Sequence, residues 1–158
     1  MPSANYLKAT NRGASGIDGL IATFAGIAKA SEQTTVGVIG DISALHDLNS
    51  IALLSQINQP TLLFVINNSG GAIFDMLPVD SKAKSQFYRL SHNLEFGQIA
   101  TMFGIEYIRP FTWADLKAKL KLAYNRRGVT LVEIKVNDQD GSNLYKSLIK
   151  QISQAEIA

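Results

Sequence analysis

The sequence predicts an α/β fold, an open and mostly parallel sheet with helices on both faces in three layers. Short apolar runs of strand length alternate along the chain with longer stretches whose apolar residues recur at the helical period. This alternation is typical of a parallel sheet covered by helices. A length of 158 residues, with 46% hydrophobic and 18% charged residues, suits one well-buried domain. We therefore expect residues 1–158 to form a single domain.

Four runs are expected to form the strands of the sheet. They are rich in branched and aromatic residues, which favour strands, and they end at glycine or polar residues. Their ranges are Thr34–Ile39, Thr61–Asn67, Ile105–Ile108 and Val129–Val136.

Five stretches are expected to form helices. Their ranges are Ile17–Ala30, Asp47–Gln56, Phe96–Phe103, Trp113–Tyr124 and Ser142–Ser153. In the second stretch, Asp47 stands where a residue would cap its own helix. The segment Asp75–Asn93 has no clear period, so we expect a long surface loop there, and loops of this length in compact domains are often functional.

Composition excludes several classes of protein. Fifteen basic and thirteen acidic residues give a net charge of +2, without the excess of basic residues typical of a nucleic-acid-binding protein. The absence of cysteine excludes disulfides and thiolate metal sites. The uncharged stretch 48–74 is interrupted by Asn, Gln, Ser and Pro, so we expect no membrane span, and no secretory leader pattern is present. A cytoplasmic location is expected.

Oxygen donors are predicted to gather where the first two strands end. Gly40-Asp41 follows the first strand, and Asn68 and Gly70 follow the second. Ligands of open parallel sheets bind at that edge, near a change in strand order. A carboxylate, an amide oxygen and a backbone carbonyl suit Mg²⁺, and glycines let the backbone approach a phosphate. Each segment alone is equally an ordinary turn, so a metal–phosphate site and two plain turns both stay open.

The spacing of these two segments resembles the signature of thiamine-diphosphate enzymes, in which a Gly-Asp is followed, after a helix, by a metal-binding Asn. Here Asn68 lies 27 positions after Asp41 (68 − 41). The common signature has Gly directly after the Asp, whereas this sequence has Ile42.

Longer segments carry a more specific pattern. They are Asn11–Gly19, Gly40–Leu45 with Asp47–Asn49, Asn67–Gly71 with Ile73-Phe74, and Val136–Asp138 with Asp140-Gly141. Together they resemble the 2-succinyl-5-enolpyruvyl-6-hydroxy-3-cyclohexene-1-carboxylate synthases of menaquinone biosynthesis (SEPHCHC synthases, the MenD family). The resemblance extends over essentially the whole chain. It implies the thiamine-diphosphate-binding fold and the C-terminal, pyrophosphate-binding domain of a longer enzyme.

The resemblance also implies roles for individual residues. The metal ligands, for Mg²⁺ or Mn²⁺, would be Asp41, Asn68 and the Gly70 carbonyl. The residues near the diphosphate would be Gly40, Ser43, Ala44 and Gly71, and those along the thiazolium ring would be Ile73, Phe74 and Leu77. Ile17 would bend the cofactor, and Arg12 would face the substrate carboxylates. Without the motifs, the same apolar residues are equally consistent with ordinary core and Arg12 with a solvated surface charge.

The resemblance further implies a transferase that decarboxylates 2-oxoglutarate and adds the resulting four-carbon unit to isochorismate. In that family a separate N-terminal, pyrimidine-binding domain contributes an essential glutamate across a dimer interface. We therefore expect this chain to be a fragment that lacks activity alone and belongs to a homo-oligomer.

Two alternatives stay open. One is the same domain of an acetolactate-synthase or 2-oxo-acid decarboxylase type of enzyme. The other is a non-catalytic nucleotide- or flavin-binding module, although the first strand is followed by no glycine-rich fingerprint. The roles of His46 and His92 also stay open, since the predicted loop offers His92 no acidic partner.

Overall fold

Four parallel strands form one sheet in the computed structural model, which describes residues 7–11, 16–31, 33–137 and 140–155. The strands are β1 (Thr35–Gly40), β2 (Thr61–Asn67), β3 (Glu106–Ile108) and β4 (Val129–Lys135), in the order β1-β2-β4-β3. All three neighbouring pairs are parallel. The four expected strands are confirmed, with ends that shift by one residue or not at all.

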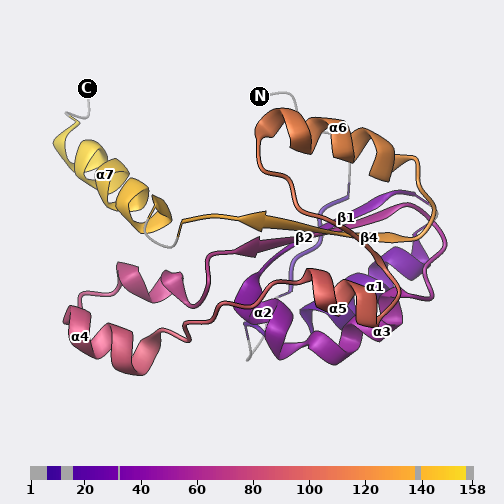
Figure 1. The fold of residues 1–158 in the computed structure, drawn as a ribbon. Coiled ribbons are helices and arrows are strands. Elements are labelled where there is room, and N and C mark those ends of the chain that lie inside the picture. Colours follow the sequence, from indigo (N-terminus) through magenta and orange to yellow (C-terminus); the bar gives the residue numbers. More distant parts are fainter. Residues whose placement is uncertain (1–6, 12–15, 32, 138–139, 156–158) are drawn as a thin grey trace.

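Helices cover both faces of the sheet, which confirms the three-layer prediction. One face carries α1 (Leu20–Ala30), α2 (Asp41–His46), α3 (Ile51–Leu54) and α5 (Gly97–Met102), and the opposite face carries α6 (Trp113–Tyr124) (Figure 1). The crossovers from β2 to β3 and from β3 to β4 run in opposite directions across the sheet. Because such crossovers are right-handed, α5 and α6 must lie on opposite faces.

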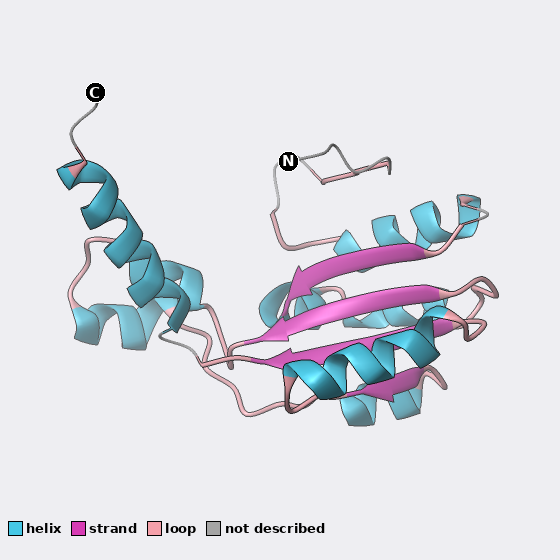
Figure 2. Cartoon of the chain, turned by 90° about the horizontal axis from the view of Figure 1, so that it is seen from above, coloured by secondary structure: helices cyan, strands magenta, loops and turns pink. Residues whose placement is uncertain are grey.

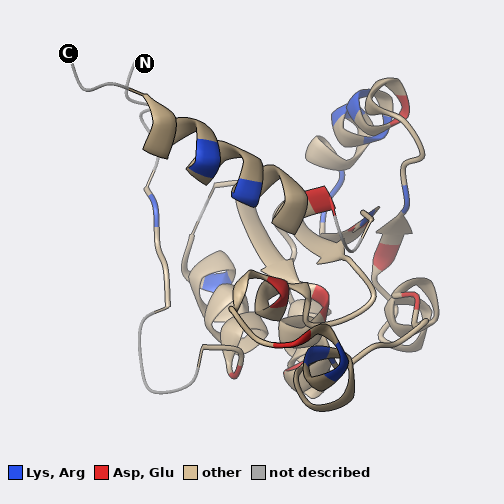
Figure 3. Cartoon of the chain, turned by 90° about the vertical axis from the view of Figure 1, so that its left-hand side faces the viewer, with Lys and Arg blue, Asp and Glu red and all other residues tan. Residues whose placement is uncertain are grey.

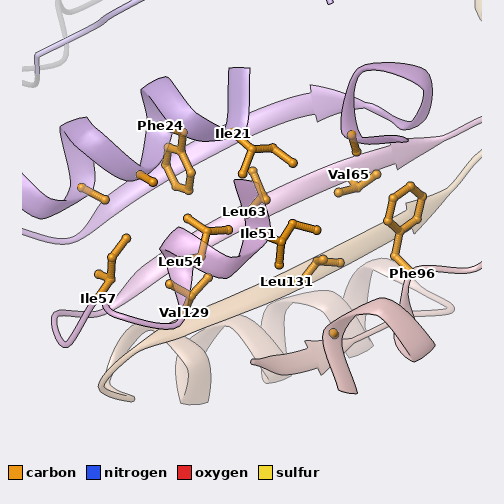
Figure 4. Close-up of a cluster of buried hydrophobic side chains, with 14 residues drawn as sticks. Ile21, Phe24, Ile51, Leu54, Ile57, Leu63, Val65, Phe96, Val129 and Leu131 are labelled. Carbon is orange, nitrogen blue, oxygen red and sulfur yellow. The ribbon is translucent and has the colours of Figure 1, made fainter. Parts of the chain in front are cut away.

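The hydrophobic core lies between the sheet and the α1 side. Side chains of α1 and α3 meet those of the central strands there, as Figure 4 shows for Ile21, Leu54, Leu63 and Leu131, each 0% exposed. Gly37 of β1 faces α1 so closely that a Cβ would lie 2.8 Å from the ring of Phe24. The opposite side of β1 is poorly covered, because Val36 and Val38 are 51% and 66% exposed.

The segment between the first two strands, where one helix over Asp47–Gln56 was expected, differs from the prediction. A short helix, α2, begins at Asp41, directly after β1, and a 3-10 turn (η1, Leu48–Ser50) precedes α3. Asp47 caps no helix of its own. Its Oδ2 accepts instead from the backbone N–H groups of Ile21 and Ala22, at 2.7 and 3.0 Å. Asp47 therefore caps α1, a helix distant from it in the sequence.

Beyond the carboxyl ends of the strands, one part of the chain projects from the sheet (Figure 2). Its elements are η2 (Ala72–Met76), α4 (Ser81–Ala83), the π-helical turn η3 (Lys84–Tyr88) and α7 (Asp140–Gln154). The expectation of a long surface loop over Asp75–Asn93 is therefore wrong for its helical segments, the last of which ends at Tyr88. Asp80 begins α4 by accepting from the N–H groups of Lys82 and Ala83, a cap of the usual kind.

Charged residues are interspersed over the described part of the chain, without one continuous basic face (Figure 3). Within the same residues, no helix combines the length and the apolar character needed to cross a bilayer.

Candidate functional site

The residues predicted to supply oxygens to a metal, Asp41, Asn68 and Gly70, lie together at the edge where the parallel strands end. β1 and β2 are neighbours in parallel register, with Gly40 opposite Ile66, so the residues after each strand end side by side. The backbone N–H of Asn68 donates to Asp41 Oδ2 at 3.1 Å. The strand order departs from the chain order next to this pair, where β4 lies between β2 and β3.

The carboxylate of Asp41 is buried and held mainly through one oxygen. Asp41 is 3% exposed. Its Oδ2 accepts from the N–H groups of Asn68 and Gly70, the latter at 3.0 Å, while Oδ1 accepts only from its neighbour Ile42 at 2.8 Å among the described residues. Backbone donors therefore fix the carboxylate, and Oδ1 keeps a lone pair for another ligand.

Asn68 supplies a second acceptor oxygen, and this one is unused. Its Oδ1 is buried and accepts no hydrogen bond from the described residues, although buried polar atoms are nearly always paired. An orphaned oxygen beside a buried carboxylate fits a cation, and both are ligands of the kind that Mg²⁺ prefers. No group of three or more His, Cys, Asp or Glu in the described residues could hold a metal. A cation here would therefore need further oxygens, such as those of a diphosphate.

The carbonyl of Gly70 is less available than its position in the sequence suggested. It accepts from the N–H of Ala72 at 2.7 Å, which leaves one of its two lone pairs. Gly70 has φ 136, and a Cβ there would lie 2.6 Å from the carbonyl oxygen of Leu90. Ser69 also has a positive φ, 63. The turn thus requires glycine at position 70 for both conformation and space.

A buried hydrogen-bond network centred on β4 supports the turn that follows β2. Glu133 of β4 is 0% exposed and accepts from Asn67 Nδ2, the backbone N–H of Phe96 and the hydroxyl of Tyr107, at 2.6, 3.0 and 2.6 Å. Asn67 in turn accepts the N–H of Ser69 at 3.0 Å. Burial, and then the hydrogen bond to Glu133, raise the pKa of Tyr107 well above its usual value.

Lys135 closes the turn from the end of β4. Its Nζ lies 2.7 Å from Ser69 Oγ and 3.3 Å from Asn67 Oδ1. The ammonium group therefore holds the side chain of Ser69 against the end of β4.

The remaining residues predicted near the diphosphate lie at the same two strand ends and in α2, with different exposure. Gly40 ends β1, Gly71 follows the turn, and Ser43 is half-buried in α2. The side chain of Ala44 is part of the hydrophobic core, at 0% exposure. The whole residue, backbone included, is therefore shielded from solvent, and its place near the diphosphate stays a prediction.

The predicted thiazolium residues do not form core. Ile73, Phe74 and Leu77, on or next to η2, are 66%, 38% and 40% exposed. Ile17, in the bend before α1, is 38% exposed. The alternative interpretation of these residues as ordinary core is therefore wrong. Arg12 lies outside the described residues.

Sequence reasoning missed three polar residues of this site. The expectation that His92 lacks an acidic partner is wrong, because its Nε2 lies 3.2 Å from Asp41 Oδ2. Glu133 and Lys135 were also missed. A glutamate inside the otherwise apolar run Val129–Ile134 was the available signal, since a buried charge demands partners. His46 is exposed at the end of α2.

Comparison with known proteins agrees with this geometry. Residues 2–134 match the model of the family described as thiamine pyrophosphate enzyme, C-terminal TPP binding domain. The chain is 85% identical over 149 residues to the 2-succinyl-5-enolpyruvyl-6-hydroxy-3-cyclohexene-1-carboxylate synthase of Haemophilus ducreyi, covering 94% of the chain and 26% of that protein. It is 64% identical over 156 residues to the synthase of the same name from Histophilus somni, covering 99% and 28%. The chain thus spans about a quarter of the length of these relatives.

Solved structures agree in fold. A putative thiamin diphosphate-dependent enzyme from Mycobacterium smegmatis is similar with TM-score 0.59 and 23% identity, over 77% of this chain and 22% of that one. Benzoylformate decarboxylase from Polynucleobacter necessarius is similar with TM-score 0.67 and 15% identity, over 78% and 24%.

Proposed function

The chain belongs to the family of thiamine pyrophosphate enzyme C-terminal, TPP-binding domains, and from this we propose that it is the diphosphate- and metal-binding domain of a SEPHCHC synthase. The observation that carries the proposal is a pair of oxygens with spare acceptor capacity at two adjacent strand ends: Asp41 Oδ1, which accepts only from Ile42 among the described residues, and Asn68 Oδ1, which accepts from none of them. The two relatives described above, at 85% and 64% identity, support the choice of synthase. No comparison favours the acetolactate-synthase or nucleotide-binding alternatives.

In this proposal the metal, Mg²⁺ or Mn²⁺, is held by Asp41, Asn68 and the remaining lone pair of the Gly70 carbonyl. Diphosphate oxygens and water would complete the shell, since Mg²⁺ combines few carboxylates with substrate phosphates. Gly40, Ser43, Ala44 and Gly71 would line the diphosphate through backbone groups and the Ser43 hydroxyl.

The exposed apolar residues around the site would enclose the reactive end of the cofactor. Ile73, Phe74 and Leu77 would exclude water from the thiazolium ring, and Ile17 would set its bend. Exclusion of water strengthens each electrostatic contact in the site. Arg12 would bind substrate carboxylates. When bound, thiamine diphosphate supplies the carbanion chemistry for the decarboxylation of 2-oxoglutarate and the transfer of its four-carbon unit to isochorismate, a step of menaquinone biosynthesis.

A further group must promote deprotonation of the cofactor, and the described glutamates of this chain are engaged elsewhere. Glu133 is buried in its network, and Glu95 and Glu106 pair with Arg109 and Arg126. We therefore assign that role to a pyrimidine-binding domain outside this chain, in a cytoplasmic homo-oligomer. The apolar surface at Phe74 and Leu77 is where such a partner would dock.

Calorimetry of thiamine diphosphate binding to the chain, with Mg²⁺ and with EDTA, tests the proposal. We expect saturable binding that requires the metal, and no product from 2-oxoglutarate and isochorismate by the chain alone. Binding of FAD or a nucleotide in place of thiamine diphosphate would instead support the nucleotide-binding alternative. Turnover by the chain alone would contradict the assignment of the glutamate to another domain.

A further inference from the structure

His92 lies against the carboxylate that the proposed function assigns to the metal. Its Nε2 is 3.2 Å from Asp41 Oδ2, and the side chains of His92 and Asp41 are 9% and 4% exposed. The contact falls outside strict hydrogen-bond geometry, but Nε2 is buried and has no other partner among the described residues. The Asp41 carboxylate is therefore the nearest acceptor for a proton on Nε2.

The other ring nitrogen determines which tautomer is present. His92 Nδ1 accepts the backbone N–H of Leu94 at 3.2 Å. A nitrogen that accepts a hydrogen bond carries no proton, so the proton of the neutral imidazole is on Nε2. His92 thus presents an N–H, and not a lone pair, to Asp41.

The backbone around His92 is hydrogen-bonded to the turn that carries Asn68 and Gly70. The N–H of His92 donates to the Ser69 carbonyl at 3.0 Å, and Asn67 Nδ2 donates to the Leu94 carbonyl at 3.0 Å. The Leu90 carbonyl packs on Gly70 so closely that a Cβ would lie 2.6 Å from it. The backbone that carries the imidazole is therefore held against the turn after β2.

The donors around Asp41 are distributed unequally between its two oxygens. Oδ2 accepts from the N–H groups of Asn68 and Gly70 and lies 3.2 Å from His92 Nε2, whereas Oδ1 accepts only from the N–H of Ile42 among the described residues. We propose that His92 is a positioning residue of the metal site, which holds Asp41 Oδ2 through its Nε2–H so that Oδ1 is directed to the cation. This inference rests on the proposed function, and it adds a residue that touches neither metal nor cofactor.

The inference is tested by the metal affinity of His92 variants, measured as the Mg²⁺ concentration needed for half-maximal thiamine diphosphate binding to the chain. Loss of a partner that orients a metal ligand weakens metal affinity about 10- to 100-fold, so we expect at least a 10-fold increase for His92→Ala. His92→Gln, whose Nε2–H can reach the same oxygen, should stay within about three-fold of the unmodified chain. His46→Ala, which removes an exposed histidine at the end of α2, serves as the matched control and should change nothing.

The outcomes separate this inference from the proposed function. If Asp41→Ala abolishes metal-dependent binding while His92→Ala leaves the Mg²⁺ requirement unchanged, the role of His92 is refuted and the metal site stands. If Asp41→Ala also leaves the requirement unchanged, the proposed function fails and the inference with it.

A second measurement needs no variant and so does not depend on whether His92→Ala folds. The ¹⁵N shifts of the His92 ring should report the Nε2–H tautomer both without ligand and with Mg²⁺ and thiamine diphosphate. An Nδ1–H tautomer, or loss of the Nε2 proton when the metal binds, would overturn the inference.

Discussion

Replacement of Glu133 by glutamine should destabilise the chain although the two side chains have nearly the same shape. Glu133 accepts from three buried or part-buried donors, on Asn67, Phe96 and Tyr107. A glutamine has one acceptor oxygen, so either orientation sets its NH₂ group against at least one donor. The Tyr107 hydroxyl can rotate to accept, but the N–H of Phe96 cannot. Asn67 could accept only by reversing its amide, which would break its bond to Ser69.

One buried donor without an acceptor costs about 1–3 kcal/mol, and this is the loss of unfolding free energy that we expect for Glu133→Gln in urea denaturation. Glu133→Ala, which leaves all three donors without an acceptor, should lose more unfolding free energy. The matched control is Glu106→Gln, which breaks the exposed ion pair with Arg126 and should cost no more than about 1 kcal/mol. Equal stability of Glu133→Gln and the unmodified chain would refute the network as described.

Three further predictions concern other positions. Gly70→Ala should destabilise the chain by about 1–3 kcal/mol and weaken cofactor binding, because φ is 136 and Leu90 leaves no room for a Cβ. In denaturation experiments the exposed Gly26→Ala control, in α1, should instead stabilise it by about 0.5–1 kcal/mol. The pKa of Tyr107 is raised, so the folded state keeps a proton that the unfolded chain loses above about pH 10; stability should fall as pH rises from there, and Tyr107→Phe should reduce that fall. Ile17→Ala should change the unfolding free energy by less than about 1 kcal/mol, since the residue is 38% exposed, while it lowers kcat in the longer enzyme more than cofactor affinity; a large loss of stability would indicate a core residue.

Features that depend on residues close in sequence were predictable. The helix Trp113–Tyr124 has the expected bounds, because Thr112 caps it by accepting from the N–H of Asp115. β2 was likewise marked by its branched and aromatic run between Pro60 and Asn68. Local capping and strand propensity act through neighbours in the chain, so a single sequence reveals them.

Features that depend on tertiary contacts were not predictable. Asp47 satisfies all the local requirements of a helix cap, yet its Oδ2 accepts from the backbone N–H of Ile21 in α1, 26 positions before it. The contact between His92 and Asp41 joins residues 51 positions apart (92 − 41). It forms only because β1 and β2 are in parallel register and because the segment around His92 is hydrogen-bonded to the turn after β2. The exposure of Phe74 and Leu77 was also invisible locally, because an apolar residue in a loop is equally consistent with core and with surface.

Titration calorimetry of Asp41→Ala tests the central claim most directly, since Asp41 provides the only carboxylate that we assign to the metal. The unmodified chain and the Asp140→Ala control, which changes an exposed residue at the start of α7, should bind thiamine diphosphate in a Mg²⁺-dependent manner. Asp41→Ala should lose that dependence and most of the affinity while still unfolding cooperatively. Undiminished, Mg²⁺-dependent binding by Asp41→Ala would contradict the account.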